Sequence, residues 1–282
     1  MTTATISQAP RRTASRLSNL RWLVSDVAVL AKRSLARIAR EPETLMDVTI
    51  QPILFVLLFA YVFGGAIPLP SGGNYHEYLI GGMLAMGLAA TAPGTAVALV
   101  SDMSTGLIDR FRSLPTSRAA VLAGRTVSDL VTQVIGTAVV AGVGLAIGWR
   151  IHSSVGDAVT AFGLALLFGY AFTWLGAFLG MVLRSPEAAQ QMGFVLFMPL
   201  LFVSNAFVPT QSMPGWLQPV AEWNPMSALA AASRHLFGNP NPAASVQSWP
   251  MQHPELAVLG WSAALLLVFA PLAVHLYRRK AR

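Results

Sequence analysis

Asp129 is the acidic residue that comes closest to the interior of a long apolar run, and it follows Arg125 by four residues. A charge at membrane depth costs about 3 kcal/mol or more, so it is kept for a purpose such as a proton relay. The simpler interpretation is a local ion pair with Arg125, one helical turn earlier. Because no charge lies deeper than this one, proton-coupled transport has little support, and the work must come from elsewhere.

Other reactive groups form no recognisable catalytic or metal site. The chain has no cysteine, and its five histidines are scattered without the HExxH spacing. Neither the GxSxG pattern of a hydrolase nor the GxxxxGK[ST] pattern of a nucleotide-binding loop occurs. We therefore expect no catalytic residue and no metal in this chain, and any ATP hydrolysis would take place on another subunit.

A short charged segment, residues 101–118, separates two long charge-free runs and reads SDMSTGLIDRFRSLPTSR. Its apolar residues lie at i, i+4 and i+7, which is one face of a helix: Leu107, Phe111 and Leu114. The other faces are polar, with Asp109, Arg110, Arg112 and Ser113. The pattern predicts an amphipathic helix that ends at Pro115 and docks on a partner outside the lipid, which we expect to be a separate ATP-hydrolysing subunit.

The composition is that of an integral membrane protein, because 54% of the 282 residues are apolar, only 11% are charged and the mean hydropathy is +0.57. A helix needs about 20 apolar residues to cross the hydrocarbon. The charge-free runs predict an all-α polytopic domain over residues 42–282 with six transmembrane helices, at about 45–67, 78–100, 127–149, 159–183, 188–207 and 256–277.

The net charge of +7 follows membrane topology and does not indicate nucleic-acid binding. Eight Lys or Arg precede the first span, four lie between residues 110 and 125, Arg184 follows the fourth span, and four end the chain. Seventeen of the nineteen basic residues are then cytoplasmic, with Arg150 and Arg234 outside. This asymmetry predicts that both termini are cytoplasmic.

The N-terminal region divides into two parts. Residues 1–19 have no periodic pattern and are predicted to be a disordered cytoplasmic tail. Residues 20–41 show an apolar stripe with basic residues off it, namely Lys32, Arg33, Arg37 and Arg40. We expect a basic amphipathic helix in the cytoplasmic interface beside anionic lipid, the alternative being a helix packed on another subunit.

Several small or rigid residues predict features inside the spans. Pro93 is expected to kink the second span, and Pro199 to break the fifth. The pairs Gly144 with Gly148 and Gly176 with Gly180 have a spacing that favours tight helix packing, although they do not by themselves establish a dimer interface. Trp149 beside Arg150 has the pattern of an aromatic residue and a snorkelling charge at the outer membrane boundary.

Residues 208–237 are neither a span nor an ordinary loop. Their first half interleaves Trp216, Leu217, Val220 and Trp223 with four prolines. We interpret the segment as short re-entrant helices that dip into the outer leaflet, which requires that other helices shield their backbone.

Three motifs together resemble the membrane subunits of type-2 ABC exporters, in the daunorubicin-resistance group found in actinobacteria. The first is RIAREPETLMDVTIQPILFVLLFAYVFGG, residues 37–65, and the second, more specific, is GLIDRFRSLPTSRAAVLAGR, residues 106–125. The third runs from Phe207 through MPGWL to Asn224 and Pro225, with Arg234 after it. The chain departs from the family pattern at Ser104, where a Glu is common, and at Leu114, where a Thr is common.

The resemblance implies a half-exporter in a bacterial plasma membrane. Two permease copies, or this chain and a related one, would form the pathway, and two cytoplasmic ATPase subunits would bind ATP and Mg and drive it. Coupling to the ATPase is implied for Gly106, Leu107, Asp109, Arg110, Phe111, Arg112, Leu114 and Pro115. An extracellular gate is implied for Phe207, Pro209, Pro214, Trp216, Asn224 and Pro225.

Two functions are consistent with the sequence. The leading hypothesis is the permease subunit of an ATP-driven exporter for a hydrophobic or amphiphilic compound, such as a drug, an antibiotic or a lipid-like metabolite. The alternative is a membrane anchor or assembly factor that transports nothing and recruits a cytoplasmic partner through the same helix. The substrate and its contact residues do not follow from the sequence.

Overall fold

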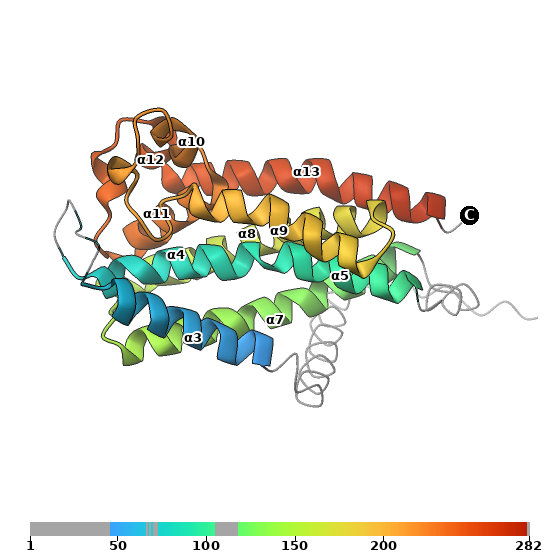
Figure 1. Cartoon of the computed structure of the whole chain (residues 1–282), viewed down its shortest axis with the longest axis horizontal. Coiled ribbons are helices and arrows are strands. Elements are labelled where there is room, and N and C mark those ends of the chain that lie inside the picture. The colour runs from blue at the N-terminus through green and yellow to red at the C-terminus, as the bar shows by residue number, and fades with distance from the viewer. Residues whose placement is uncertain (1–45, 66, 68, 70–72, 105–117, 281–282) are drawn as a thin grey trace, which may run out of the picture.

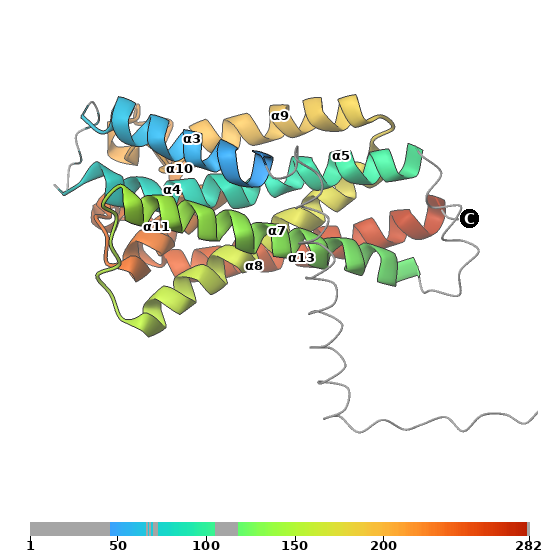
Figure 2. The ribbon, with the colours of Figure 1, turned by 90° about the horizontal axis from the view of Figure 1, so that it is seen from below.

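The computed structural model describes residues 46–65, 67, 69, 73–104 and 118–280, and within these ranges every regular element is helical. The long helices run side by side along the long axis of the molecule, and short helices gather at one end (Figures 1 and 2). In chain order the elements are η1 (Met46–Ile50), α3 (Gln51–Leu58), η2 (Phe59–Phe63), α4 (Tyr75–Ala89), α5 (Thr91–Ser104), α7 (Arg118–Ala146), α8 (Val155–Val182), α9 (Pro186–Phe202), η3 (Thr210–Ser212), α10 (Gln218–Glu222), α11 (Pro225–Phe237), η4 (Pro242–Ser245), α12 (Trp249–Gln252) and α13 (Pro254–Lys280).

Four of the described helical segments are long and apolar enough to cross a membrane: Tyr75–Met103, Ser128–Ala146, Val155–Val182 and Pro254–Tyr277. These coincide with the second, third, fourth and sixth predicted spans, and the all-helical class is confirmed. The first predicted span corresponds to the shorter apolar helix Gln51–Phe63, and the fifth to the 17 residues of α9. Six spans therefore remain a prediction.

Proline affects two helices differently. The helix of the second span is interrupted at Ala90, between α4 and α5, three residues before Pro93. Since proline has no N–H, the carbonyl four residues earlier loses its helical donor. The interruption lies where the kink was predicted, and the kink itself stays a prediction. The prediction that Pro199 breaks the fifth span was wrong, because α9 continues through Pro199 to Phe202. Proline at this position removes one helical donor, the one to the carbonyl of Val195, and the helix ends three residues later.

Glycine allows α8 to lie directly against α5. A Cβ on Gly176 would lie 2.2 Å from the carbonyl oxygen of Ala92, and one on Gly180 would lie 3.0 Å from that of Ala96. The tight packing predicted for this pair is confirmed, and it occurs within the chain. Gly148 behaves differently, because α7 ends at Ala146 and Gly148 adopts a positive φ of 103° in the turn that follows.

The main apolar core joins α4, α8 and α11 and includes Tyr78, Phe168 and Phe237. A smaller core joins α8 to α13 farther along the bundle, around Trp174 and Tyr277. Large apolar side chains also cover the outward surfaces of the helical segment 46–63, of α9 and of α13. Such surfaces suit contact with lipid or with another membrane subunit.

Candidate functional site at the capped end

Residues 203–253 form a cap over one end of the bundle, which we call the capped end (Figure 1). Its longest helix, α11, packs on α4, α8 and α13. The short helices predicted within residues 208–237 are present as η3, α10 and α11. The cap is therefore a structured assembly that connects the ends of three long helices.

Arg234 is at the centre of this cap and is only 1% exposed. Its Nε donates to the carbonyl oxygen of Tyr78 at 2.8 Å, and its Nη2 donates to those of Asn205 and Ala206 at 3.0 and 2.8 Å. The guanidinium carbon lies 3.5 Å from the centroid of the Tyr78 ring. One fork-shaped cation thus joins α11, α4 and the turn after α9.

The sequence placed Arg234 outside the membrane and at the end of the third motif, without predicting its contacts. A usable signal was its spacing from Ser227, because the two residues are seven apart on α11 and share a face. Both contact the same turn: Ser227 Oγ accepts a hydrogen bond from the backbone N–H of Asn205 at 2.9 Å. A polar pair at helical spacing in a helix otherwise poor in charge could have indicated a buried polar contact.

Phe207, one of the six predicted gate residues, connects the cap to the first helical segment. Its ring stacks on Phe59 with centroids 4.2 Å apart and planes 11° apart. Its carbonyl oxygen accepts a hydrogen bond from the Tyr75 hydroxyl at 3.2 Å. The backbone turn that Arg234 holds is therefore also fixed to η2 and to the start of α4.

Asn224 and Pro225 anchor the start of α11. Asn224 Oδ1 accepts from the backbone N–H of Met226 at 2.8 Å, which caps the helix, and Pro225 occupies its first turn. Asn224 Nδ2 also donates to the carbonyl oxygens of Leu200 and Val203, at the end of α9. A single side chain therefore joins the last turn of one helix to the first turn of another.

The six predicted gate residues do not form one cluster. Four of them, Phe207, Pro209, Asn224 and Pro225, are buried in the cap. Pro214 and Trp216 are exposed, and Trp216 has 77% of its surface free. Trp223 and Trp249 are likewise exposed, at 56% and 50%. Trp249 begins α12, whereas Trp216 lies in a turn and Trp223 directly follows α10. Exposed tryptophans at one end of a helical bundle are typical of residues at a membrane interface.

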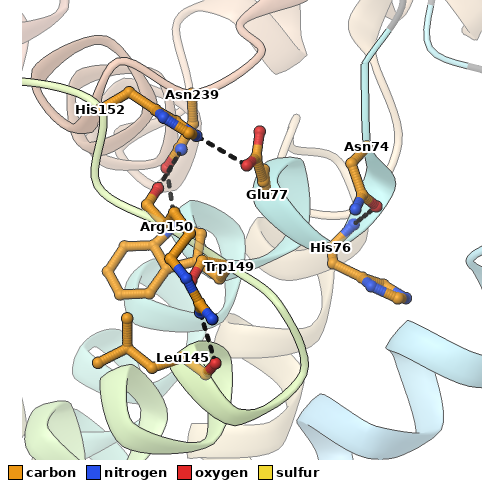
Figure 3. Close-up of polar contacts among 8 residues, drawn as sticks. All are labelled: Asn74, His76, Glu77, Leu145, Trp149, Arg150, His152 and Asn239. Atoms are coloured by element: carbon orange, nitrogen blue, oxygen red, sulfur yellow. Dashed lines mark hydrogen bonds and ion pairs between the residues drawn. The ribbon is translucent and has the colours of Figure 1, made fainter.

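Trp149 is fully buried, so its interpretation as a residue of an exposed aromatic belt was wrong. Its indole N–H donates to Asn239 Oδ1 at 2.7 Å, and its ring meets Phe237 edge-on with centroids 5.1 Å apart. Burial is favourable because the single polar group of the indole has a partner inside the protein. Figure 3 shows Trp149, in the loop after α7, beside Asn239, in the loop after α11.

Arg150 closes the end of α7. Its Nη1 donates to the carbonyl oxygens of Leu145 and Trp149 at 2.6 and 2.7 Å, and its own carbonyl accepts from Asn239 Nδ2 at 2.8 Å (Figure 3). Unlike Arg234, its side chain is exposed. A cation at a helix C-terminus stabilises the free carbonyls there. The two arginines predicted to lie outside the membrane thus have different roles. Arg150 binds the free carbonyls at the end of α7, and Arg234 joins three segments inside the cap.

Comparison with known proteins decides the family. Residues 25–237 match the family described as ABC-2 type transporter. The chain belongs to this family. The permease is 35% identical to the daunorubicin resistance ABC transporter permease protein DrrB1 of Streptomyces coeruleorubidus, covering 85% of this chain and 81% of that one. It is 26% identical to the probable doxorubicin resistance ABC transporter permease protein DrrC of Mycobacterium tuberculosis, covering 99% and 97%.

A more distant similarity, 25% identity over 92% of the permease, is to the putative transport permease ycf38 of Cyanophora paradoxa. The family assignment makes the chain a multi-pass membrane subunit of an ABC transporter. In such transporters permeases pair with ABC ATPase subunits, and it is the ATPase that binds ATP.

The remaining predicted residues of the permease fall largely outside the described ranges. The interfacial helix residues Lys32, Arg33, Arg37 and Arg40 do so, as do the coupling residues from Gly106 to Pro115. Asp129 is described: its Oδ2 accepts a hydrogen bond from Thr95 Oγ1 at 2.9 Å. The side chain of Arg125 is not described, so the predicted ion pair stays a prediction.

Proposed function

We propose that this chain is the permease subunit of an ATP-driven exporter that moves a hydrophobic or amphiphilic compound out of the cell. The observation that carries the proposal is the match to the ABC-2 family over residues 25–237, together with relatives named as daunorubicin and doxorubicin resistance permeases. The absence of a nucleotide-binding loop from the sequence agrees with a separate energy source.

The proposed topology has six spans, both termini in the cytoplasm and the capped end outside. The C-terminal end of α13 lies at the end of the bundle opposite the cap (Figure 1). Basic residues support this orientation, since Arg184 and Arg279 belong to the uncapped end, while Arg150 after α7 and Arg234 in the cap belong to the capped end. The exposed tryptophans of the cap would then lie at the outer interface.

Coupling to the energy source is proposed for residues 101–118, a segment whose first four residues form the end of α5. Two ATPase subunits would dock there, and Phe111 would be the aromatic side chain that enters a groove on the ATPase. The basic helix at residues 20–41 would lie beside them at the membrane surface. A second permease copy, identical or related, would cover part of the apolar surface that α9 and the segment 46–63 leave exposed.

The outer gate is proposed for Phe207 and its buried neighbours Pro209, Asn224 and Pro225. Phe207 connects the turn after α9 to Phe59 of η2 by a ring stack. A relative movement of these two segments would have to separate the rings. Pro214 and Trp216 are exposed, so their part in the gate would be to hold the cap at the interface.

The decisive experiment reconstitutes the permease with its cognate ATPase in sealed proteoliposomes and measures ATP-dependent uptake of lipophilic dyes into inside-out vesicles. We expect flux and dye-stimulated ATP hydrolysis only when both subunits are present. Binding of the ATPase to the membrane without ATP-dependent flux would favour the anchor function. Flux driven by a proton gradient with the permease alone would contradict the exporter proposal.

The coupling helix is tested by Phe111→Ala in the same vesicles. We expect the permease to insert at its normal level while ATP hydrolysis no longer drives flux, because the proposed docking contact would be lost and Phe111 lies outside the predicted spans. Arg110→Ala and Arg112→Ala are the matched controls on the same segment. If the segment only lies on anionic headgroups, these two changes will reduce flux more than Phe111→Ala does.

A further inference from the structure

A cavity of about 470 Å³ lies between α3, the junction of α4 with α5, and α7, which are neighbours in the bundle (Figures 1 and 2). Its volume is in the range of small-molecule sites. Gly87, Ala90 and Gly94 line the cavity and are exposed, so it opens to the surface of the permease along α4 and α5. A molecule can therefore reach those lining residues that keep accessible surface.

Asp129 is the only ionisable residue among the described residues that line this cavity. It is half-buried, so its neighbours do not close it off completely. Its Oδ2 accepts a hydrogen bond at 2.9 Å from Oγ1 of Thr95, which lines the cavity from α5. A carboxylate accepts up to about four hydrogen bonds. Asp129 can thus keep its bond to Thr95 and accept from a bound molecule as well.

The position of Asp129 favours a cationic ligand group. The residue is the second of the segment Ser128–Ala146, which is long and apolar enough to cross a membrane. In the proposed topology this is the cytoplasmic boundary of the hydrocarbon. A carboxylate beside apolar surface attracts a cation more strongly than the same pair would attract each other in water, because the effective dielectric constant is lower.

The wall of the cavity changes from polar to apolar toward the capped end. Beside Asp129, the uncapped end has the exposed Gln51 of α3 and the half-buried Thr132 of α7. Nearer the cap, the lining residues that keep accessible surface include Phe55 of α3 and Met86 of α4. Aromatic and thioether side chains adapt to flat apolar ligands. The cavity therefore suits an amphiphile whose polar end points to the cytoplasm.

We propose that this cavity binds an amphiphilic organic cation from the inner leaflet, with its charged group at Asp129 and its apolar body beside Phe55 and Met86. Asp129 is then a residue that selects the compound. A proton relay would need a further ionisable group, and none of the other described lining residues has one. The proposal rests on the proposed transport function and topology, to which it adds a substrate class and the place of recognition.

The chain offers a direct way to probe the cavity, because it contains no cysteine. A Cβ added at Gly136, which lines the cavity, meets nothing within 4 Å, and the same holds for Gly163 of α8, which does not line it. The two glycines lie at similar depth, since Gly136 is ten residues before the end of α7 at Ala146 and Gly163 is eight residues after the start of α8 at Val155. Gly136→Cys and Gly163→Cys are therefore a matched pair of variants.

The experiment measures how fast N-ethylmaleimide modifies each cysteine variant of the full-length permease in phosphatidylcholine nanodiscs, followed by mass spectrometry. The probes are 1-pyrenemethylamine and 1-pyrenemethanol, which share one apolar body, and only the amine is a cation at neutral pH. We expect the amine to protect the Gly136→Cys variant at about tenfold lower concentration than the alcohol, the effect of one charge-assisted hydrogen bond. Neither probe should protect the Gly163→Cys variant.

Asp129→Asn, made in the Gly136→Cys background, tests the carboxylate itself. Asparagine removes the charge and keeps an oxygen that can accept from Thr95. We expect the two probes then to protect equally, at the concentration that the alcohol needs in the parent. Asp129→Glu keeps the charge and should keep the preference for the amine. If Asp129 only holds α5 to α7, the asparagine variant will retain that preference, which would contradict the assignment.

Three results in the parent variants would overturn the proposal. Equal protection by both probes would mean that the charge of Asp129 is neutralised within the chain, as the predicted ion pair with Arg125 would do. No protection by either would mean that the cavity does not bind such molecules, and equal protection of both cysteines would mean partition into the lipid. Flux of the amine, measured on the same permease with its ATPase, separates the two proposals. Flux without protection removes the site and keeps the exporter, while protection without flux does the reverse.

Discussion

The capped end and the cavity of about 470 Å³ between α3, α4, α5 and α7 lie along the same helix, α4, and differ in how closely neighbouring backbone approaches that helix. At the capped end a Cβ on Gly82 would lie 1.8 Å from the carbonyl oxygen of Ala206, and Arg234 is bonded to three backbone carbonyls. Five residues later Gly87 borders the cavity, and a Cβ there meets nothing within 4 Å.

The contrast is one of space, because buried polar atoms without a partner among the described residues occur at both places. They include Thr210 Oγ1 and Ser233 Oγ in the cap, and Gln133 Oε1 and Thr137 Oγ1 on α7. In the cap, Arg234 bonds to backbone carbonyls of the segments that it joins, which fixes their positions. Close packing of this kind suits a rigid closure, whereas the space beside Gly87 leaves α4 room to move. Substitutions at matched positions can test whether this distinction is correct.

The largest expected effect is that of Arg234→Met. Methionine keeps much of the side-chain volume but leaves the carbonyls of Tyr78, Asn205 and Ala206 buried without their donor. At about 1–3 kcal/mol for each lost partner, the free energy of unfolding should fall by about 3 kcal/mol or more. Thermal unfolding of the purified permease measures it, and poor recovery of folded protein from the membrane would show the same loss.

Arg150→Met is the matched control, since it removes the other arginine of this region. Arg150 is exposed, and water can replace it at the carbonyls of Leu145 and Trp149. We expect a change of about 1 kcal/mol or less. Equal effects of the two substitutions would mean that the cap does not depend on its central cation.

A second test compares alanine at two glycines of α4. Gly82→Ala forces the Ala206 backbone away and should destabilise the permease by about 1–3 kcal/mol or more. Gly87→Ala has room and improves helix propensity, so it should be neutral or stabilise by up to about 1 kcal/mol. Circular dichroism melts of both variants would decide the sign. Destabilisation of equal size at both positions would show that the cavity is closely packed in the protein.

The sequence predicted those features that depend on local pattern. Apolar runs of about 20 residues located the long helices, Pro93 located an interruption, and Gly176 with Gly180 located a close helix contact. Each depends on residues within one or two turns of each other, or on the length of a run, and so can be recognised without knowing the fold.

Features that depend on distant partners could not be predicted in this way. The buried position of Trp149 requires an acceptor from Asn239, 90 residues later, and Arg234 bonds to Tyr78, 156 residues earlier. By local pattern alone, a tryptophan beside an arginine at a helix end is typical of the membrane interface. The cavity is harder still, because it is a space between helices that no single segment encodes.

The smallest of the three stability effects is expected for Asn224→Ala, and it tests whether the cap and α9 behave as one unit. Alanine removes the cap of α11 and the donor to Leu200 and Val203, so a loss of about 1–2 kcal/mol is expected. Ser154→Ala is the control: Ser154 caps α8 by accepting from Asp157 N–H at 3.2 Å but joins no second helix. Its loss should be smaller, about 0.5–1 kcal/mol. If hydrogen exchange at the end of α9 rises only in the Asn224→Ala variant, the cap and the end of α9 behave as one unit, and the gate residues move with that helix. Equal exchange in both variants would mean that the cap and α9 move independently. A movement of α9 would then not reach Phe207 through Asn224.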